Sequence, residues 1–444
     1  MRNILIIGAG RSASSLIKYL LDKSSEEDLH LLIADISLEL ADRKTNNHPN
    51  ATAIALDILN EQQRNKTVAS SDLVISMLPA HLHIEVAKDC IRFKKHMVTA
   101  SYISEQMQAL DDEAKANELV FMNEVGLDPG IDHMSAMKVI DEIKQQGGVI
   151  KSFKSYCGGL VAPESNTNLW EYKFTWAPRN VVLAGQGGVA KYLEKGQFKY
   201  IPYVNLFRRA EKINVNGFGD FEAYANRDAM KYKSIYGIDE AETMYRGTIR
   251  NIGFSAAWNV FVQLGMTDDS YKMETTATMT YREFLNSFLP FDNVLSVESK
   301  LKRFLEADQK AAIFEKIAEL DLFSSTKIVG LVQASPAEIL EKILTESWFL
   351  QPTDKDMIVM CHEFGYQING KDKQIDSKMV CIGEDQTYTA MAKTVGLPVA
   401  MTSLLILNGK INTYGVQLPI HKNIYEPILK ELEKHGVVFE EIYS

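Results

Sequence analysis

Cysteine is scarce in this chain, and its four cysteines (Cys90, Cys157, Cys361 and Cys381) form no CxxC pair. This spacing argues against a zinc site or a disulfide framework and favours reduced thiols in the cytoplasm. A basic excess is also missing, since the net charge is -10, so we expect no nucleic-acid partner. Long apolar runs such as VGLPVAMTSLLILNG are short for a bilayer span and contain polar residues, so we expect no membrane association.

The amino-terminal MRNILIIGAG has glycines where a signal peptide would need an apolar helix. A chain of 444 residues is long enough for about two or three domains. The composition therefore predicts a cytoplasmic protein of several domains.

A glycine-rich turn follows the first apolar segment, in NILIIGAGRSASSLIKYL. Gly8 permits a tight turn, Gly10 lets the backbone approach a pyrophosphate, and Ala13 is small enough for the point where helix meets strand. The amino terminus of the following helix offers unpaired N–H groups to phosphates. The pattern predicts dinucleotide contacts from Gly8, Gly10, Arg11, Ser12 and Ala13.

The second apolar segment, LHLLIAD, ends at Asp35. A Rossmann unit places at this point the carboxylate that accepts hydrogen bonds from the adenine ribose. Because a carboxylate repels a 2′-phosphate, Asp35 favours NAD over NADP. Arg43 follows closely and would weaken this preference, so NADP remains possible.

Strands and helices keep alternating up to about residue 130. ATAIALDI ends at Asp57 and Ile58, which commonly flank adenine in such folds, and DLVISMLPA contains Ser76. HMVTASY and LVFMNEVGLDPG supply the fifth and sixth strands. The alternation predicts a doubly wound parallel Rossmann sheet, with ligands at the carboxyl ends of its strands.

The segment NEVGLDPGIDH brings Glu124, Asp128, Asp132 and His133 together after the sixth strand. We expect no metal here, because these residues are not accompanied by a second cluster of ligands, such as an HxxxH motif. Asp132 is predicted to cap the helix that follows and His133 to be structural. Asp128 is predicted to lie in a ligand pocket. His81 and His83 are interpreted as partly exposed or close to the cofactor.

The pattern changes from about residue 150. A second, largely antiparallel sheet is predicted from VIKSFKSYCGGLVAPE, YKFTWAPRNVVLAG, QFKYIPYVNLF, AEKINVNGFGDFEAYAN, TKIVGL and a hairpin around Asn369-Gly370. SPAEILEKIL begins with a capping box inside a mostly helical stretch, and TYTAMAKTVGLPVAMTSLLILNG predicts an apolar helix ending at Gly409.

We expect that last helix to return to the nucleotide domain. The predicted domains are residues 1–130 with about 390–444 (Rossmann), 131–280 with about 351–389 (α/β substrate-binding) and 281–350 (helical insertion).

Six motifs together resemble the L-glutamate-forming saccharopine dehydrogenase family, also called saccharopine reductase. They are GLDPGIDH (126–133), SYCGGLVAPE (155–164), YKFTWAPRNVVLAG (172–185), ANRDA (225–229), MYRGTIRNIGF (244–254) and MAKTVGLPVAM (391–401). The chain departs from the commoner wording at GRSAS and at ANRDA, where a serine often ends the motif. The resemblance implies a Rossmann domain, a mixed α/β substrate and dimerisation domain, a helical domain and a homodimer.

The resemblance also implies NAD(P)-dependent interconversion of saccharopine with L-glutamate and 2-aminoadipate 6-semialdehyde in lysine metabolism, by hydride transfer and imine hydrolysis. The implied substrate contacts are Ser101, Tyr102, Asp128, Arg227, Thr248, Ile249 and Arg250. The implied cofactor contacts add Asp35, Asp57, Ile58, Ser76, Ala100, Ser101, Leu127, Asp128 and Pro129 to the glycine-rich turn.

The residue types suit this chemistry. Arg227 and Arg250 are natural clamps for the three carboxylates of saccharopine, and Asp128 can pair with an ammonium. Tyr102, Asp128 and Cys157 are candidates for proton transfer, with His133 a fourth. The glycines after Cys157 either let the backbone approach a ligand or form an ordinary turn at a strand end.

Two other interpretations stay open. A related imine reductase acting on polyamines, such as carboxynorspermidine or homospermidine, shares the glycine-rich turn but needs an acidic pocket, which Arg227 and Arg250 do not provide. A non-catalytic nucleotide sensor would keep the fold without turnover.

Overall fold

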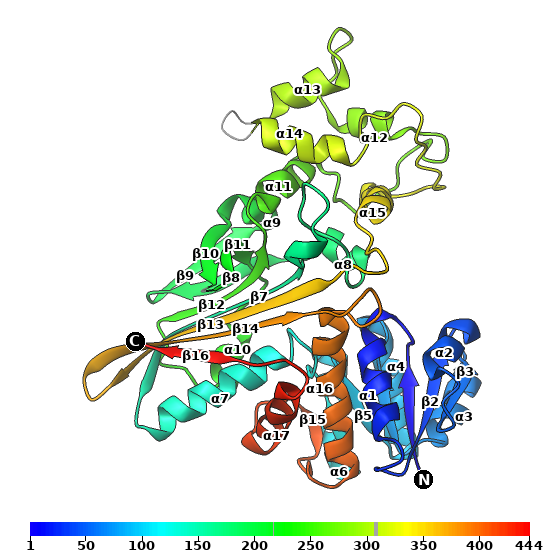
Figure 1. Cartoon of the computed structure of the whole chain (residues 1–444), viewed down its shortest axis with the longest axis vertical. Coiled ribbons are helices and arrows are strands. Elements are labelled where there is room, and N and C mark those ends of the chain that lie inside the picture. Colours follow the sequence, from blue (N-terminus) through cyan, green and yellow to red (C-terminus); the bar gives the residue numbers. More distant parts are fainter. Residues whose placement is uncertain (216, 306–309) are drawn as a thin grey trace. The chain divides into compact units, whose positions relative to one another are not determined.

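The computed structural model describes residues 1–215, 217–305 and 310–444 (Figure 1). The chain divides into two compact units. The first unit contains Met1–Val149, Tyr366–Lys373 and Met379–Ile442; the second contains Ile150–Gly365, Gln374–Lys378 and Tyr443–Ser444.

The first unit is built on a seven-stranded sheet of order β15-β6-β5-β4-β1-β2-β3. Its strands pair in parallel, as predicted for a Rossmann fold. The order reverses at β1, so the carboxyl ends of β1 and β4 border the crevice where ligands bind in such sheets. The strands are β1 (Arg2–Ile7), β2 (Leu29–Asp35), β3 (Ala51–Ala55), β4 (Leu73–Ser76), β5 (His96–Thr99), β6 (Val120–Met122) and β15 (Gly415–Gln417).

Apolar residues recur on one buried face of Ser14–Lys23 and His83–Phe93, two of the helices that lie between and after these strands. The helices of this unit are η1 (Arg11–Ala13), α1 (Ser14–Lys23), α2 (Leu38–Thr45), α3 (Glu61–Ala69), η2 (Ala80–Leu82), α4 (His83–Phe93), α5 (Glu105–Gln108), α6 (Asp111–Ala116), α7 (Ile131–Gln145), α16 (Ala390–Leu407) and α17 (Lys422–Glu433).

Helix α16 packs along α1, far from it in sequence (Figure 1). Gly396 makes the close approach possible, because a Cβ there would lie 2.9 Å from the Leu16 nitrogen and 3.0 Å from the Ser12 carbonyl oxygen. The helix therefore lies in the same unit as the glycine-rich turn.

Helix α16 is also the apolar run that the sequence analysis considered too short for a bilayer. Over its 18 residues the mean hydropathy is 1.6, so by length and composition alone it could cross a membrane. However, 78% of it is buried inside the protein. Burial against α1 explains its composition as that of a core helix.

Helix α7 also belongs to the first unit, although the sequence analysis began the second domain at residue 131. It packs against α17, and the Tyr425 hydroxyl donates a hydrogen bond to the Asp141 carboxylate at 2.6 Å. These contacts explain why the first unit extends to Val149.

The second sheet has nine strands, in the order β10-β11-β12-β7-β13-β14-β16, with β8 beside β12 and β9 beside β8. It is mixed, because β7 and β12 are parallel whereas β10, β11 and β12 are antiparallel. The strands are β7 (Val149–Val161), β8 (Val189–Glu194), β9 (Gln197–Pro202), β10 (Glu211–Val215), β11 (Gly219–Ala225), β12 (Thr243–Arg250), β13 (Asp356–Ile368), β14 (Lys371–Ile382) and β16 (Glu440–Tyr443).

The predicted hairpin around Asn369-Gly370 is confirmed. Strands β13 and β14 flank these two residues (Figure 1). Their φ angles are +51° and +73°, which suits a two-residue hairpin turn.

Three predicted strands were wrong or incomplete. YKFTWAPRNVVLAG contains α8 (Pro178–Val182) and no strand, TKIVGL makes only an isolated bridge between Ile328 and Thr280, and QFKYIPYVNLF ends in α9 (Tyr203–Leu206). In the first case, Tyr172 and Phe174 are buried against Trp348. Their apolar spacing reflects an aromatic core. Strands β8, β12, β15 and β16 were also not predicted from the sequence.

The segment from Tyr281 to Leu350 is mostly helical, as predicted, within the described residues. The capping box of Ser335 and Glu338 is present, and Thr280 and Glu283 form a second one. The remaining helices are η3 (Pro163–Ser165), η4 (Phe207–Arg209), α10 (Lys231–Ile235), α11 (Phe254–Leu264), α12 (Tyr281–Phe288), α13 (Val297–Phe304), α14 (Lys310–Glu319) and α15 (Pro336–Ser347).

Candidate cofactor and substrate sites

The glycine-rich turn has the geometry that a dinucleotide requires. Gly8 has a φ of +106°, and a Cβ there would lie 2.8 Å from the Met77 carbonyl oxygen. A Cβ on Gly10 would meet no protein atom within 4 Å, so the backbone there is open to a close ligand. Arg11 to Ala13 form a short 3-10 turn that leads into α1. The predicted phosphate-binding turn therefore fits a pyrophosphate at the start of this helix.

Asp35 is fixed at the end of β2 by two backbone groups. Its Oδ2 accepts a hydrogen bond from the Ala9 nitrogen at 2.8 Å, and its Oδ1 accepts one from the Ser37 nitrogen at 3.0 Å. The next residue, Ile36, is 78% exposed. The carboxylate therefore lies against the glycine-rich turn, beside an exposed apolar side chain.

The two basic residues that follow on α2 have other contacts. Arg43 is 3.6 Å from the Glu39 carboxylate in an exposed ion pair. The Lys44 ammonium donates a hydrogen bond to the Ser14 hydroxyl, and burial lowers the pKa of Lys44. Neither contact directs a cation at the Asp35 carboxylate.

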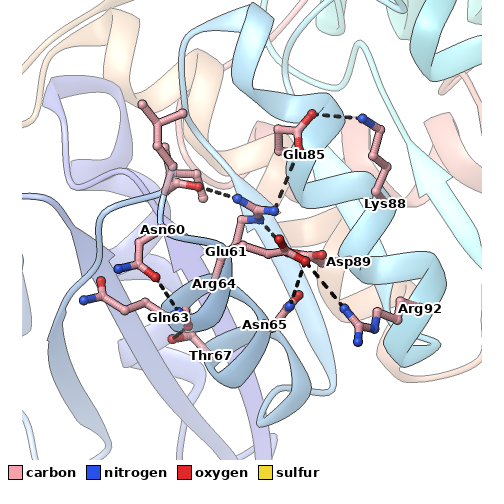
Figure 2. A network of polar contacts seen from close by, with 12 residues as sticks. Asn60, Glu61, Gln63, Arg64, Asn65, Thr67, Glu85, Lys88, Asp89 and Arg92 are labelled. Atoms are coloured by element: carbon pink, nitrogen blue, oxygen red, sulfur yellow. Dashed lines mark hydrogen bonds and ion pairs between the residues drawn. The ribbon is translucent and has the colours of Figure 1, made fainter.

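Asp57 and Ile58 adjoin Asp35, since the Leu56 nitrogen donates to the Asp35 carbonyl oxygen at 2.9 Å. The loop containing them is anchored by Arg64, whose guanidinium donates to the Ile58 carbonyl oxygen at 2.7 Å. Figure 2 shows the surrounding network, in which Arg64 Nε lies 2.5 Å from Asp89 Oδ2. Arg64 and Asp89 are both 5% exposed. The network ties the loop between β3 and α3 to α4.

His83 joins the ends of β4 and β5. Its Nδ1 is 2.8 Å from the Ser76 hydroxyl, and its Nε2 is 2.7 Å from the Ser101 hydroxyl. Burial lowers the pKa of His83 to about 4. Of the two alternatives for His83, partly exposed or close to the cofactor, the first is wrong because the side chain is buried. The second agrees with its contacts to two predicted cofactor residues, although these contacts themselves were not predicted. The start of α4 after Ser76 was the available signal, but a helix start does not show where a side chain points.

The loops after β5 and β6 lie side by side. The Glu124 nitrogen donates to the Ser101 carbonyl oxygen at 3.1 Å, and the Ile103 nitrogen donates to Glu124 Oε1 at 2.9 Å. The Tyr102 hydroxyl donates to Asp128 Oδ1 at 3.3 Å. Two candidates for proton transfer are thus brought together.

Tight backbone packing also brings together the other predicted cofactor residues of these two loops. A Cβ on Gly126 would lie 2.9 Å from the Ala100 Cβ, and the Asp128-Pro129 peptide bond is cis. The predicted cofactor residues Ala100 and Leu127 to Pro129 therefore share one edge of the sheet with Tyr102.

Asp132 does not cap α7, contrary to the prediction. The helix begins at Ile131 with Gly130 at its amino-terminal cap, and Asp132 Oδ1 instead accepts a hydrogen bond from the Gly130 nitrogen at 2.5 Å. His133 Nε2 lies 3.0 Å from Glu124 Oε2, and both side chains are fully buried. A structural role for His133 agrees with this burial. Among the described residues no group of three or more His, Cys, Asp or Glu could hold a metal ion.

Arg250, in the second unit, is a buried guanidinium surrounded by aromatic rings. Its Cζ lies 5.1 Å from the Tyr172 ring centroid, 5.3 Å from that of Phe254 and 5.8 Å from that of Tyr224. One guanidinium nitrogen donates to the Ile249 carbonyl oxygen at 2.9 Å. Within the described part of the chain, the buried Nε has no hydrogen-bond partner.

The carboxylate that lies opposite Arg250 on the neighbouring strand already accepts hydrogen bonds from other groups. Glu222 of β11 lies opposite Arg250, but it accepts hydrogen bonds from the backbone nitrogens of Gly253 and Ser255 at the start of α11. A buried charge without an ion pair is costly, so Arg250 fits the binding of an anionic group.

Thr248 and Ile249 precede Arg250 on β12. Thr248 pairs with Cys157 of β7, so the third proton-transfer candidate lies in the second unit. A Cβ on Gly158 would lie 2.5 Å from the Ile249 carbonyl oxygen, and β7 continues to Val161. Gly158 therefore allows two strands to pack closely, and the interpretation as an ordinary turn at a strand end is wrong for it.

Arg227 lies just beyond the end of β11, exposed and with a φ of +49°. Ala225, two residues earlier, pairs with Gly247, whereas Arg250 pairs with Glu222. The two predicted clamps therefore lie at different ends of the β11–β12 pairing. A single ligand bound by both arginines would need carboxylates that are well separated.

Comparisons with known proteins match the whole chain. Residues 4–122 match the model of the saccharopine dehydrogenase NADP binding domain, and residues 126–437 match that of the saccharopine dehydrogenase C-terminal domain. Saccharopine dehydrogenase [NADP(+), L-glutamate-forming] from Saccharomyces cerevisiae is 34% identical over 99% of both chains, and the enzyme of that name from Schizosaccharomyces pombe gives the same values.

A mitochondrial alpha-aminoadipic semialdehyde synthase from Bos taurus is 34% identical over 99% of this chain and 47% of its own. The solved structure of apo histidine-tagged saccharopine dehydrogenase (L-Glu forming) from Saccharomyces cerevisiae has a TM-score of 0.91, with 33% identity and full coverage of both chains. The chain belongs to the saccharopine dehydrogenase family.

Proposed function

We propose that this chain is a nicotinamide-dependent saccharopine dehydrogenase of the L-glutamate-forming kind, which interconverts saccharopine with L-glutamate and 2-aminoadipate 6-semialdehyde. The relatives that match along its full length support this reaction. The structural observation that carries it is Arg250, a buried guanidinium whose Nε lacks a partner among the described residues. Bound nicotinamide would accept the hydride from the lysine-derived ε-carbon of saccharopine.

The chain's own residues bind the substrate and move its protons in this proposal. Arg250 binds one substrate carboxylate, because a guanidinium forms two parallel hydrogen bonds to it. Asp128 accepts the proton of the secondary amine, and the hydrogen bond from the Tyr102 hydroxyl holds its carboxylate in place. Asp128 gives this proton up to solvent, and its carboxylate then takes a proton from the water that adds to the iminium carbon and passes it to the nitrogen. Loss of the hydroxyl proton breaks the carbon–nitrogen bond, which releases glutamate and leaves the aldehyde. Cys157 remains the alternative proton carrier.

The proposed cofactor is NAD, with NADP as the alternative. The names of the fungal relatives specify NADP(+), so the cofactor proposed for this chain differs from theirs. It rests on the Asp35 carboxylate, which two backbone nitrogens fix, and on the apolar Ile36 beside it. A 2′-phosphate would meet a negative charge and an apolar side chain at this position.

Two further features are proposed. No disulfide joins the four cysteines among the described residues, which agrees with a cytoplasmic location, and the homodimer rests on family resemblance alone. A polyamine imine reductase and a non-catalytic sensor are not favoured, because the matching relatives are saccharopine dehydrogenases and aminoadipic semialdehyde synthases.

Product analysis tests the proposed reaction. Purified protein is incubated with saccharopine and NAD, and L-glutamate and reduced cofactor are quantified. The proposal predicts equal molar amounts of both, and no cofactor reduction with carboxynorspermidine as substrate. Reduction with the polyamine, and none with saccharopine, would overturn it.

A further inference from the structure

His83 is a buried histidine to which the reaction described above assigns no role. It is the first residue of α4, and its ring lies between the end of β4 and the segment after β5. Both ring nitrogens contact a serine hydroxyl, Nδ1 that of Ser76 at 2.8 Å and Nε2 that of Ser101 at 2.7 Å. Thr99 Oγ1 is 3.4 Å from the same Nε2, so Ser101 is the closer partner of that nitrogen.

The ring can supply only one proton to these two contacts. Burial lowers the pKa of His83 to about 4, so the imidazole is neutral near pH 7 and carries one N–H donor and one acceptor nitrogen. One serine hydroxyl must therefore donate to the ring and the other must accept from it. If Ser101 donates to the ring, only its lone pairs are left for a ligand, whereas if it accepts from the ring its own proton stays free to donate.

The Ser101 hydroxyl lies where a ligand is expected, whereas Ser76 is fully buried and anchors the ring. Ser76 pairs with Ile7, immediately before the glycine-rich turn, and Ser101 adjoins Tyr102, which donates to Asp128. Both serines thus lie at the carboxyl ends of neighbouring strands, between the phosphate-binding turn and the proposed proton carrier. Ligands of doubly wound sheets bind outside these strand ends.

We propose that His83 is a positioning residue that, held by the buried Ser76, fixes the Ser101 hydroxyl as one kind of hydrogen-bonding group, donor or acceptor, toward the nicotinamide end of the bound cofactor. The carboxamide of nicotinamide offers one carbonyl acceptor and one amide donor to such a hydroxyl. The inference rests on the proposed function, because that function requires a nicotinamide at this edge.

The test separates positioning from simple structural support. His83→Phe keeps a planar ring and removes both nitrogens, while His83→Asn and His83→Gln each keep an amide near one nitrogen position. His30→Phe is the matched control, because His30 also contacts a hydroxyl (Thr52 Oγ1, 2.9 Å) but is only half-buried on β2. For each variant, the dissociation constants of NADH and of ADP-ribose, which lacks nicotinamide, are measured together with the melting temperature and with kcat and KM for NAD.

The expected result is selective. His83→Phe should weaken NADH binding about 10-fold and leave ADP-ribose binding within about twofold, since the hydrogen bond between Ser101 and the nicotinamide end is misdirected. One of the two amide variants should recover part of the loss, and His30→Phe should change neither constant. In the His83→Phe background, adding Ser101→Ala should cost little more, because the hydroxyl has already lost its orientation.

Two outcomes would overturn the inference. Equal weakening of NADH and ADP-ribose binding would make His83 a general structural support, and a lower melting temperature with unchanged NADH binding would do the same. The binding comparison needs no turnover. An inactive wild-type enzyme would therefore count against the proposed reaction, while the ratio of the two constants would still decide the role of His83.

Discussion

The carboxylate of Asp35 accepts a hydrogen bond from the backbone nitrogen of Ala9, with 2.8 Å between the two atoms. This contact joins the carboxyl end of β2 to the glycine-rich turn after β1. The group predicted to bind ribose and the turn predicted to bind phosphate therefore form one surface. Cofactor choice depends on this surface, because the fixed carboxylate can accept from ribose hydroxyls and repels a 2′-phosphate.

Replacing Asp35 should shift the cofactor preference. In Asp35→Ala the ratio of kcat/KM with NADP to kcat/KM with NAD should rise about 10- to 100-fold, because one repulsive charge and one ribose acceptor are lost together. Steady-state kinetics with both cofactors measure this ratio. Asp42→Ala, an exposed change on α2, controls for net charge and should leave the ratio unchanged. An unaltered ratio in Asp35→Ala would show that the carboxylate does not select the cofactor.

Replacing Arg250 should remove substrate binding with little loss of stability. KM for saccharopine should rise about 100-fold or more in Arg250→Met, as expected when a buried charge partner is truncated, while KM for NAD stays the same. Arg250→Lys should restore little of the saccharopine binding, because an ammonium cannot form the two parallel hydrogen bonds.

The stability of Arg250→Met provides a second test. The guanidinium is buried and its Nε lacks a partner among the described residues, so an apolar replacement removes a desolvation cost. The melting temperature should therefore stay near that of the wild type, as in the exposed control Arg209→Met. A large drop in melting temperature with unchanged KM for saccharopine would mean that Arg250 is structural.

The buried pair of Arg64 and Asp89 (Figure 2) should matter for stability. Arg64→Met should lower the free energy of unfolding by about 3–5 kcal/mol, because it leaves the Asp89 charge buried without its partner. The exposed pair of Arg43 and Glu39 is the control, and Arg43→Met should cost less than about 1 kcal/mol.

Urea denaturation measures both effects. Replacing both partners, as in Arg64→Met with Asp89→Leu, should recover most of the loss, since no unpaired charge then remains. Equal costs for Arg64→Met and Arg43→Met would contradict the assigned role of the pair.

The native thiols should react slowly near neutral pH. Burial raises the pKa of Cys361 to about 12 and also raises the pKa of Cys90. Below these values the thiols stay protonated, and only the thiolate is nucleophilic. Alkylation by iodoacetamide at pH 8, followed by mass spectrometry, should therefore be slow at both cysteines and should accelerate at Cys361 as the pH rises. Protein in urea, whose thiols have an ordinary pKa, is the control; equally rapid labelling of native Cys361 at pH 8 would refute the expectation.

Local patterns predicted much of the first unit. Continuous apolar runs bounded by glycines and polar residues identify buried parallel strands, and the end of each such run located Asp35, Ser76 and the loop containing Asp128. The capping box at Ser335 and the Asn369-Gly370 turn are also local, because their geometry depends on residues only a few positions apart.

Other features depend on contacts between distant residues. Tyr172 and Phe174 mimic a strand pattern, but they pack on Trp348, which lies far away in sequence. The links from His83 to Ser101 and from Arg64 to Asp89 join different elements of the sheet and its helices. The burial of Arg250 likewise depends on rings contributed by three separate segments. Periodicity and motif spacing carry no information on such contacts.

The most direct test of the central claim is a steady-state assay of the purified protein with saccharopine at mildly alkaline pH, first with NAD and then with NADP, following the appearance of reduced nicotinamide. The account predicts turnover of saccharopine with a higher kcat/KM for NAD than for NADP. Turnover with NADP alone would keep the reaction and contradict the role of Asp35. No reduction of either cofactor would contradict the assignment of saccharopine as the substrate.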